Sequence, residues 1–234
     1  MRASNFDLCA RVCVSILIVN LLSASAVGSA KMISNEFSAG GLDIRYEVPS
    51  VLQMGYGGAK SELTFSRSHG PDKYYPLGPD AREQTEATYY RDVKGDFADW
   101  STTVAVFGCK FEGGVPPIES LAAYIKLHCS VQYVLKDGGK INSWSSVVVT
   151  ELGDRAAVLC ESTDEWRGQS VELQNGVKMV MRPMLVVYVP ISKDIVFGIR
   201  ILDYKRNRRV AWANEMKKWA DDIVSSLRIS VSTP

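Results

Sequence analysis

Residues 194–230 read DIVFGIRILDYKRNRRVAWANEMKKWADDIVSSLRIS and contain the clearest structural signal in the chain. An apolar strand is predicted first, followed by a basic turn, a helix over 211–226 and a short final strand. The predicted helix carries one apolar stripe with spacings of four, three, four and four residues, close to the helical period. The stripe consists of Trp212, Met216, Trp219, Ile223 and Leu227. Because two tryptophans on one stripe need a broad, flat partner, we expect this helix to pack on a β-sheet.

The chain before residue 101 is expected to supply strands. Lys31–Ala39 is interpreted as a loose terminus. Alternating apolar residues predict a strand over Leu42–Val48, and Val51–Tyr56 and Lys60–Arg67 are interpreted as two more. We expect these three strands to form an antiparallel meander.

A second helix is predicted near the middle of the chain. Ser101–Phe111 is typical of a strand, and Pro116-Pro117 then opens a helix expected over 118–129. Asp137-Gly138-Gly139 predicts a tight turn. Four long strands are predicted after it, and their short connections favour antiparallel neighbours. These strands are Trp144–Leu152, Arg155–Ser162, Lys178–Ile191 and Asp194–Tyr204.

Two polar segments leave alternatives open. Ser68–Trp100 is interpreted as an insert at about 68–100, in which Ala81–Tyr90 is either a short helix or a polar edge strand. Thr163–Gly176 is either a polar hairpin tip or an extra pair of short strands. We find no internal repeats. Together the patterns predict a signal peptide over 1–30 and one α+β domain over 31–234, with a central antiparallel sheet flanked by two main helices.

The first thirty residues predict export. Arg2 and Arg11 are followed by the apolar run Val12–Leu22 and by small residues at Ala24-Ser25-Ala26 and Gly28-Ser29-Ala30. This order is typical of a cleaved secretory signal peptide. The alternative is a transmembrane anchor, but the run is shorter than the roughly 20 residues that a span needs. We therefore expect a periplasmic or secreted protein with no stable membrane span after cleavage.

The charge and composition of the chain limit which classes of partner are expected. The formal net charge of the 234 residues is +1 and 46% are hydrophobic, as in an ordinary globular protein. No general affinity for nucleic acid is expected. Of the cysteines, Cys109, Cys129 and Cys160 follow the predicted signal peptide. Their apolar neighbours favour burial as free thiols over a disulfide with one thiol left over.

No catalytic or metal-binding motif is present in the sequence. His69 is interpreted as part of a loop and His128 as a surface residue near a helix end. The carboxylate pairs Asp164-Glu165 and Asp221-Asp222 fall on a predicted loop and a solvent face. We therefore expect neither a cofactor nor a metal ion. Two alternative functions stay open: a hydrolase that uses scattered carboxylates, and a small-molecule or lipid carrier.

The chain resembles the PsbP-like superfamily, in particular its DcrB-like periplasmic and lipoprotein members. The matching segments are the strand Leu42–Pro49, the helix start Pro116–Ile125, the strands between Val147 and Leu202, and the ending Trp219–Ile229. The segment 68–100 departs from the pattern as an insertion. The resemblance implies an α+β fold without shared catalytic residues, and a role as a binder, adaptor or assembly factor.

These observations predict a non-enzymatic exported protein that acts through an envelope or secreted protein partner. An immunity protein against a secreted toxin is one specific form of that function. Aromatic residues and arginine are enriched where partners bind. We expect the partner to contact the insert and the polar tip through Tyr74, Tyr75, Tyr89, Tyr90, Trp100, Trp166 and Arg167.

Overall fold

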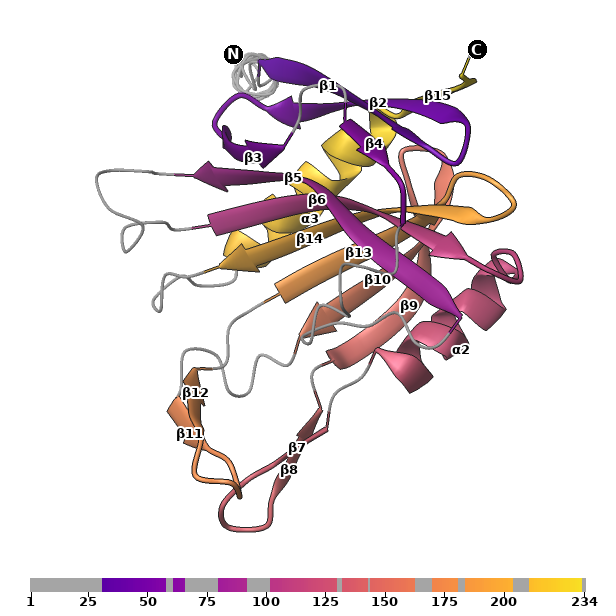
Figure 1. Ribbon diagram of the computed structural model, residues 1–234. Coiled ribbons are helices and arrows are strands. Elements are labelled where there is room, and N and C mark those ends of the chain that lie inside the picture. The colour runs from indigo at the N-terminus through magenta and orange to yellow at the C-terminus, as the bar shows by residue number, and fades with distance from the viewer. Residues whose placement is uncertain are drawn as a thin grey trace, which may run out of the picture. The chain divides into compact units, whose positions relative to one another are not determined.

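The computed structural model describes residues 31–57, 61–65, 80–91, 102–129, 132–142, 144–162, 170–180, 184–203 and 211–232. The predicted signal peptide lies outside these ranges. One compact unit extends over Met32–Pro234. Within it, the described strands form two sheets and two separate hairpins, and the described helices are α2 (Ile118–His128) and α3 (Ala211–Ser225) (Figure 1).

The larger sheet has seven strands, and every neighbouring pair in it is antiparallel. In order across the sheet they are β3 (Gln53–Gly57), β5 (Ala81–Arg91), β6 (Thr102–Phe111), β14 (Ile195–Asp203), β13 (Met184–Pro190), β10 (Arg155–Ser162) and β9 (Trp144–Leu152). The smaller sheet has four: β15 (Arg228–Val231), β2 (Leu42–Pro49), β1 (Met32–Ala39) and β4 (Ser61–Leu63). Only the β1–β4 pair of this sheet is parallel. The hairpins are β7 (Gln132–Val134) with β8 (Lys140–Asn142), and β11 (Ser170–Glu172) with β12 (Lys178–Val180).

The large sheet separates two hydrophobic cores. Side chains of a strand alternate between its two faces, so a strand buried on both faces is apolar throughout. Strand β13 shows this: Leu185 and Val187 enter the core shared with the small sheet and α3, whereas Val186 and Tyr188 enter the core under α2. The sheet therefore carries α3 and the small sheet on one face and α2 on the other.

Helix α3 confirms the periodicity that predicted it. Met216, Trp219, Ile223 and Leu227 are all buried in the first core. The side chain of Trp212 lies outside the described residues. Burying each such side chain contributes about 1.5–3 kcal/mol, which makes this stripe a main support of the fold.

Helix α2 is also confirmed. It begins after Pro117, and Leu121 and Ile125 are its buried residues. It ends where the Cys129 N–H donates to the Ile125 carbonyl at 2.8 Å. Tyr124 packs edge-on against Phe111 of β6, with ring centroids 5.7 Å apart, so α2 is fixed to the second core by its aromatic residue as well.

The N-terminal strands differ from the prediction. Lys31–Ala39 is not a loose terminus, because β1 pairs with β2 along its whole length. Gly40 and Gly41 join the two strands with φ of 59° and 80°, a turn in which both central residues need positive φ. The predicted meander is wrong, because β3 joins the large sheet whereas β2 and β4 lie in the small one. The chain crosses between the two sheets, and buried residues of both sheets pack in the first core.

Two later expectations are also corrected. Ala81–Tyr90 is neither a helix nor an edge strand, because β5 lies between β3 and β6 inside the large sheet. The interval predicted as an insert therefore contains an integral strand. The predicted strand Lys178–Ile191 is two strands, β12 and β13, which belong to different sheets. Of Thr163–Gly176, the described part contains one short strand, β11, and its partner β12 lies beyond this interval, in the segment predicted as the next strand.

Candidate functional site

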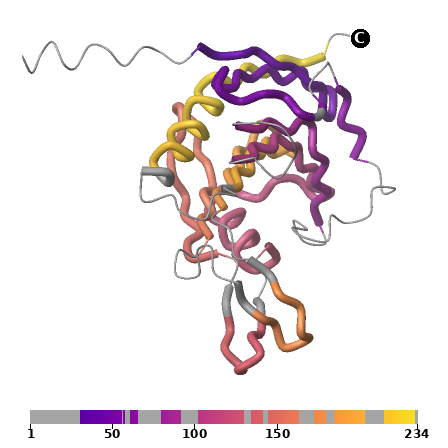
Figure 2. Tube along the Cα trace, turned by 90° about the vertical axis from the view of Figure 1, so that its left-hand side faces the viewer, coloured from indigo at the N-terminus to yellow at the C-terminus, as the bar shows by residue number. Residues whose placement is uncertain are grey.

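Two small hairpins form a unit that we call the twin-hairpin arm, consisting of 132–142 and 170–180. Figures 1 and 2 show both hairpins extending together from one end of the large sheet, away from both sheets. Each hairpin pairs antiparallel within itself. Three residue pairs in each are all that the ladders contain, so the hairpins depend on each other for support.

Backbone hydrogen bonds join the two hairpins reciprocally. The Lys136 N–H donates to the Glu172 carbonyl at 3.0 Å, and the Gln174 N–H donates to the Val134 carbonyl at 2.9 Å. Leu135 and Leu173 form an antiparallel bridge between these bonds. The Lys136 ammonium adds an ion pair to Glu172, with Nζ and Oε1 2.9 Å apart. This reciprocity means that the hairpins are related by an approximate local twofold axis.

The two turns repeat one another in sequence and geometry. Leu135-Lys136-Asp137-Gly138 corresponds to Leu173-Gln174-Asn175-Gly176, and in each the glycine N–H donates to the leucine carbonyl at 2.9 Å. The glycines have φ of 85° and 80°. The side chains of Asp137 and Asn175 accept from the N–H two residues on, at 2.9 and 3.1 Å. The two turns are therefore of the same type, with Asp137 and Asn175 at equivalent positions.

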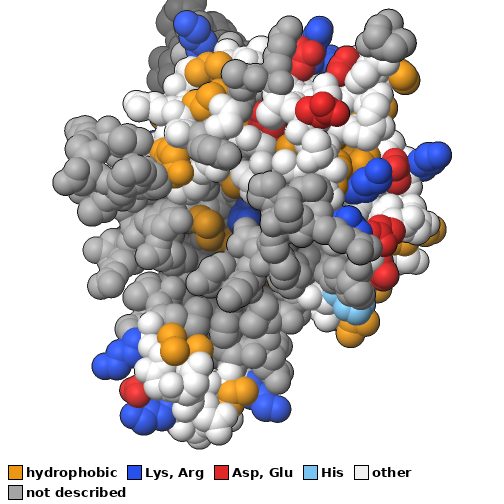
Figure 3. Space-filling model, in the orientation of Figure 1, with side chains coloured by type: hydrophobic (Ala, Val, Ile, Leu, Met, Phe, Trp, Pro, Cys, Tyr) orange, Lys and Arg blue, Asp and Glu red, His pale blue; other side chains and the backbone are white. Residues whose placement is uncertain are grey.

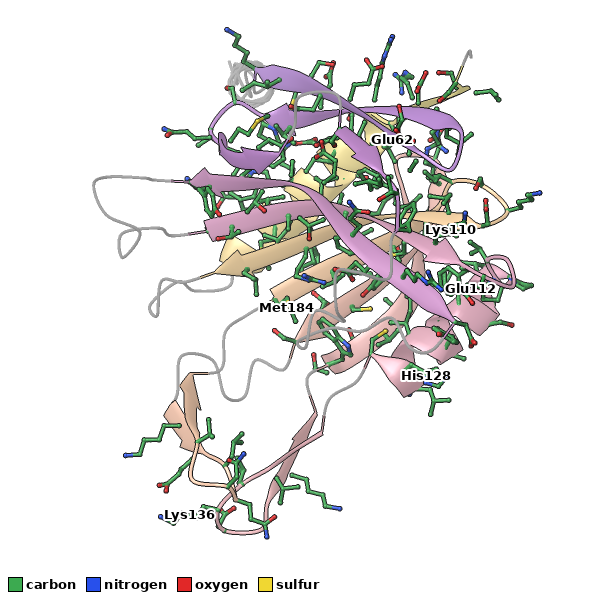
Figure 4. The ribbon with its side chains drawn as sticks, viewed as in Figure 1. Glu62, Lys110, Glu112, His128, Lys136 and Met184 are labelled. Atoms are coloured by element: carbon green, nitrogen blue, oxygen red, sulfur yellow. The ribbon has the colours of Figure 1, made fainter. Side chains whose placement is uncertain are left out.

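The surface of the arm is polar, and its described charged side chains are three lysines and the acids Asp137 and Glu172. Lys136, Lys140 and Lys178 are exposed, and Figure 4 shows Lys136 at the far end of the arm. Blue side chains dominate the charged groups of this region in Figure 3. Val177 is 51% exposed among them. A polar loop with an exposed apolar residue resembles the rim and centre of a protein interface.

None of the arm side chains that the structure describes belongs to either core. Leu135 is buried, at 8% exposed, but it lies against the other hairpin and in neither core cluster. Ordering each backbone residue costs about 1–2 kcal/mol, and burial in a core normally offsets that cost. The arm residues whose side chains are described lack this compensation.

The predicted partner-binding residues are only partly within the described ranges. Tyr74, Tyr75, Trp100, Trp166 and Arg167 all lie outside them, so their role stays a prediction.

The position of Tyr89 contradicts the prediction that this residue binds a partner. It is 1% exposed, and its hydroxyl lies 2.7 Å from that of Tyr46 in the first core. A residue buried in this way is not available to a partner. Tyr90 is half-buried and packs over Gly55 of β3, where an added Cβ would meet the tyrosine ring. Both tyrosines therefore have packing roles inside the domain.

A buried polar cluster links the two sheets. The Tyr46 hydroxyl of β2 donates to Glu86 Oε2 of β5 at 2.8 Å, and the Ser61 hydroxyl of β4 donates to Glu86 Oε1 at 3.1 Å. Glu86 is 2% exposed. Burial, with Tyr89 and Glu86 nearby, raises the pKa of Tyr46 well above its ordinary value. Every one of these groups bonds within the cluster, so the arrangement is suited to joining sheets.

The second core contains an ion pair and three thiols. Arg200 of β14 pairs with Glu83 of β5 at 2.6 Å, both side chains being under a tenth exposed, and its guanidinium lies 5.1 Å from the Phe107 ring centre. Cys109, Cys129 and Cys160 are free and buried, as the sequence predicted. Burial raises the pKa of Cys129 to about 12, and it raises the pKa values of the other two thiols as well. Such thiols stay protonated and unreactive at neutral pH.

The remaining candidate groups of the sequence have structural partners. Asp221 Oδ1 accepts from the Gly153 N–H at 3.0 Å, and Asp222 pairs with Lys218 at 2.7 Å. His128 is exposed near the end of α2, as predicted, and its ring centre lies 4.5 Å from that of Tyr124. His69 and the pair Asp164-Glu165 lie outside the described ranges.

The described residues contain no group of three or more histidine, cysteine or acidic side chains that could hold a metal ion. Among the same residues, no helix has the length and apolar content needed to cross a membrane.

A surface pocket of about 560 Å³ lies at the start of α2. Pro116, Pro117 and Pro190 form rigid walls, and Arg155 supplies a charged group. Proline offers no N–H donor, so the pocket has few groups that could orient a ligand. Its size falls in the range of small-molecule sites, but its polar groups do not define a reaction.

Comparison with known proteins gives a fold likeness only. No protein-family model matches the chain, and no curated protein matches it either. Among solved structures, it is similar to LpqN of Mycobacterium tuberculosis, a protein involved in cell envelope biogenesis, with a TM-score of 0.40 and 12% identity. It is also similar to cyanobacterial PsbP (CyanoP) from Synechocystis sp. PCC 6803, with a TM-score of 0.41 and 9% identity. Each match covers 88% of this chain and 96% of the other.

One of these neighbours is itself a PsbP, the group named in the resemblance drawn from the sequence. At TM-scores near 0.4 the superposition is loose, and it carries no inference about what this chain binds.

Proposed function

We propose that this chain is a non-enzymatic exported binding protein that engages a protein partner through the twin-hairpin arm. The observation that supports this proposal is the reciprocal pairing of two hairpins outside both cores, with the bonds between Lys136 and Glu172 and between Gln174 and Val134. The described side chains of the arm are ordered without the core burial that ordinarily stabilises a segment. A contact between the arm and a partner protein would supply the stabilisation that the cores do not.

The chemistry of the arm matches this use. Its described side chains include three exposed lysines, and of these only Lys136 has an ion-pair partner within the arm. Lys140 and Lys178 follow the two turns at equivalent positions. Their basic charge suits an acidic protein surface, and charge complementarity of this kind guides association and orientation.

The cellular compartment and the kind of partner make the proposed function more specific. The layout of the first thirty residues supports export to the periplasm or beyond. An immunity protein that binds a toxin in that compartment is one form of the function, and an adaptor in envelope assembly is another. The identity of the bound protein separates the two.

Site-specific photo-crosslinking in the host tests the proposal. A photoreactive amino acid replaces Asn175 at the arm tip, and a control replaces Leu127, a 73% exposed residue of α2. We expect a discrete protein adduct from position 175 that is missing from position 127, identified by mass spectrometry. Equal adducts from both positions, or none from position 175, would contradict the proposal.

A further inference from the structure

Strand β9 forms one edge of the large sheet. Its nine residues, WSSVVVTEL, pair with β10 on one side, and none of the described strands pairs with the other side. An edge strand presents unpaired N–H and C=O groups to any extended chain that approaches it. Helices α2 and α3 cover the faces of the sheet, and covering a face leaves the edge accessible.

The other described sheet edges are less suited to pairing. At the opposite edge of the large sheet, β3 has five residues and an irregular register between Met54 and Tyr56. In the small sheet the edge strands β4 and β15 have three and four residues. Strand β9, in contrast, pairs regularly with β10 from Ser146 to Leu152. It also contains no lysine and no proline, the residues with which natural edge strands prevent association.

We propose that β9 pairs antiparallel with β9 of a second copy of this chain, about a twofold axis at Val148. Val148 is the midpoint of the strand, so this register pairs the regular residues Ser146–Thr150 with their own copies, on one side of the irregularity at Ser145. A twofold axis perpendicular to the sheet keeps each face in place, and the two large sheets become one continuous sheet. This inference concerns a different surface from the arm and does not depend on the proposed partner.

The sequence of β9 is complementary to itself in this register. Val148 lies opposite its own copy, Val147 opposite Val149, and Ser146 opposite Thr150. Pairs of β-branched residues and serine–threonine pairs are favourable across neighbouring strands. The strand carries one charge, Glu151, which lies opposite Ser145. No like charges therefore oppose each other.

Val148 provides the apolar contact at the axis. It is 44% exposed, and its partner on β10 is Leu159, which belongs to the core under α3. Its side chain consequently lies on the α3 face of the sheet. Pairing brings two exposed valines together at the axis and removes apolar surface from water.

Introducing a positive or a negative charge at Val148 tests this proposal. Sedimentation velocity is measured on the chain from Lys31 onward, which contains the compact unit and both described cores. The wild type is expected to form a dimer reversibly as its concentration rises. V148K and V148E each place two like charges opposite one another, which raises the dimer dissociation constant by about tenfold or more. An equimolar mixture of V148K and V148E is expected to regain the dimer, because opposite charges then meet.

Met54→Lys is the matched control. Met54 lies on β3 at the other edge of the same sheet and is 46% exposed. It should leave the dimer unchanged, and circular dichroism of every variant verifies the fold. A wild type that stays monomeric at millimolar concentration overturns the proposal. A mixture of V148K and V148E that fails to associate, or an equal loss of dimer in M54K, also overturns it.

Discussion

The large sheet and the twin-hairpin arm are both antiparallel β-structure, yet they are stabilised in different ways. In the sheet, central strands such as β13 and β14 bury residues on both faces, and two helices and a second sheet cover them. In the arm, two hairpins hold each other through a few backbone bonds and one ion pair. Core packing therefore sets the global stability, whereas the arm opens or changes at little cost to the rest.

Removing a core aromatic should have the largest effect. Phe197 of β14 is fully buried, and its ring centre lies 6.4 Å from that of Phe37 and 5.8 Å from that of Tyr46. Phe197→Ala should cost about 3–5 kcal/mol, because it leaves a cavity where the two sheets meet. Urea denaturation measures this loss. A cost below about 1 kcal/mol would show that the sheets do not share one core.

Breaking the buried ion pair should have a comparable or slightly smaller effect. Glu83→Ala leaves the Arg200 charge buried, and such losses cost about 3–5 kcal/mol. The paired change Glu83→Leu with Arg200→Met should recover most of that stability, because two buried apolar groups replace two desolvated charges. Thermal unfolding of the single and double variants measures the difference. Equal destabilisation in both would mean that packing around Phe107, and not charge, sets the cost.

The same contrast explains what the sequence could predict. Helix α3 and helix α2 follow from local periodicity and from Pro116-Pro117, since each signal lies within one turn of the residues that it orders. The roles of β1 and β5 do not follow from local sequence, because distant segments determine them: β1 pairs with β4 as well as β2, and β5 lies between β3 and β6.

The mistaken role of Tyr89 has the same cause, because the segment taken as an insert contains β5, a strand inside the large sheet. A shift between Thr85 and Ala87 changes which residues of β5 face the first core. One extra residue in a strand reverses the faces that follow it, and the sequence pattern contains no sign of it. In the arm, Asp137-Gly138-Gly139 predicts its own turn correctly. The second hairpin pairs with the first through Leu135 and Leu173, which are distant in sequence, so local reasoning missed the unit.

The buried tyrosine cluster predicts a smaller effect that depends on pH. Burial raises the pKa values of Tyr46 and Tyr89 above the ordinary value of 10. Their contribution is therefore complete below pH 10 and decreases at higher pH, because only the unfolded chain ionises these phenols readily. We expect the free energy of unfolding to fall above about pH 10, by up to about 1.4 kcal/mol per pH unit for each tyrosine. Tyrosinate absorbance should rise together with unfolding.

Tyr46→Phe isolates one member of the cluster. It removes the donor to Glu86 and should cost about 1–3 kcal/mol at neutral pH. It should also make the alkaline decrease shallower. Tyr124 is half-buried and packs on Phe111 and His128 in the other core, with no bond to Glu86, so Tyr124→Phe gives the comparison. An unchanged alkaline slope in Tyr46→Phe would contradict the assignment.

The smallest expected effect on global stability is in the arm, and it follows from the turn glycines. Gly138 and Gly176 have positive φ, and an added Cβ at either would meet no atom within 4 Å. Alanine at these positions is therefore strained only by its backbone, by about 1–2 kcal/mol. Because neither core contains a described arm side chain, that strain should open the arm locally and change the global free energy of unfolding by less than about 0.5 kcal/mol.

Hydrogen exchange distinguishes local from global opening. The amides of Lys136 and Gln174 donate between the hairpins, so both should exchange faster in Gly138→Ala and, by the local twofold, equally in Gly176→Ala. Gly139→Ala is the control for an ordinary φ, since Val177 occupies the equivalent position; its added Cβ would lie 3.1 Å from the flexible Asp137 side chain. If the global midpoint falls with Gly138→Ala but not with Gly139→Ala, the arm and the cores unfold as one unit. If only the Lys136 and Gln174 amides exchange faster, the arm opens independently of the cores. Its tip can then vary in sequence to suit a partner without loss of global stability.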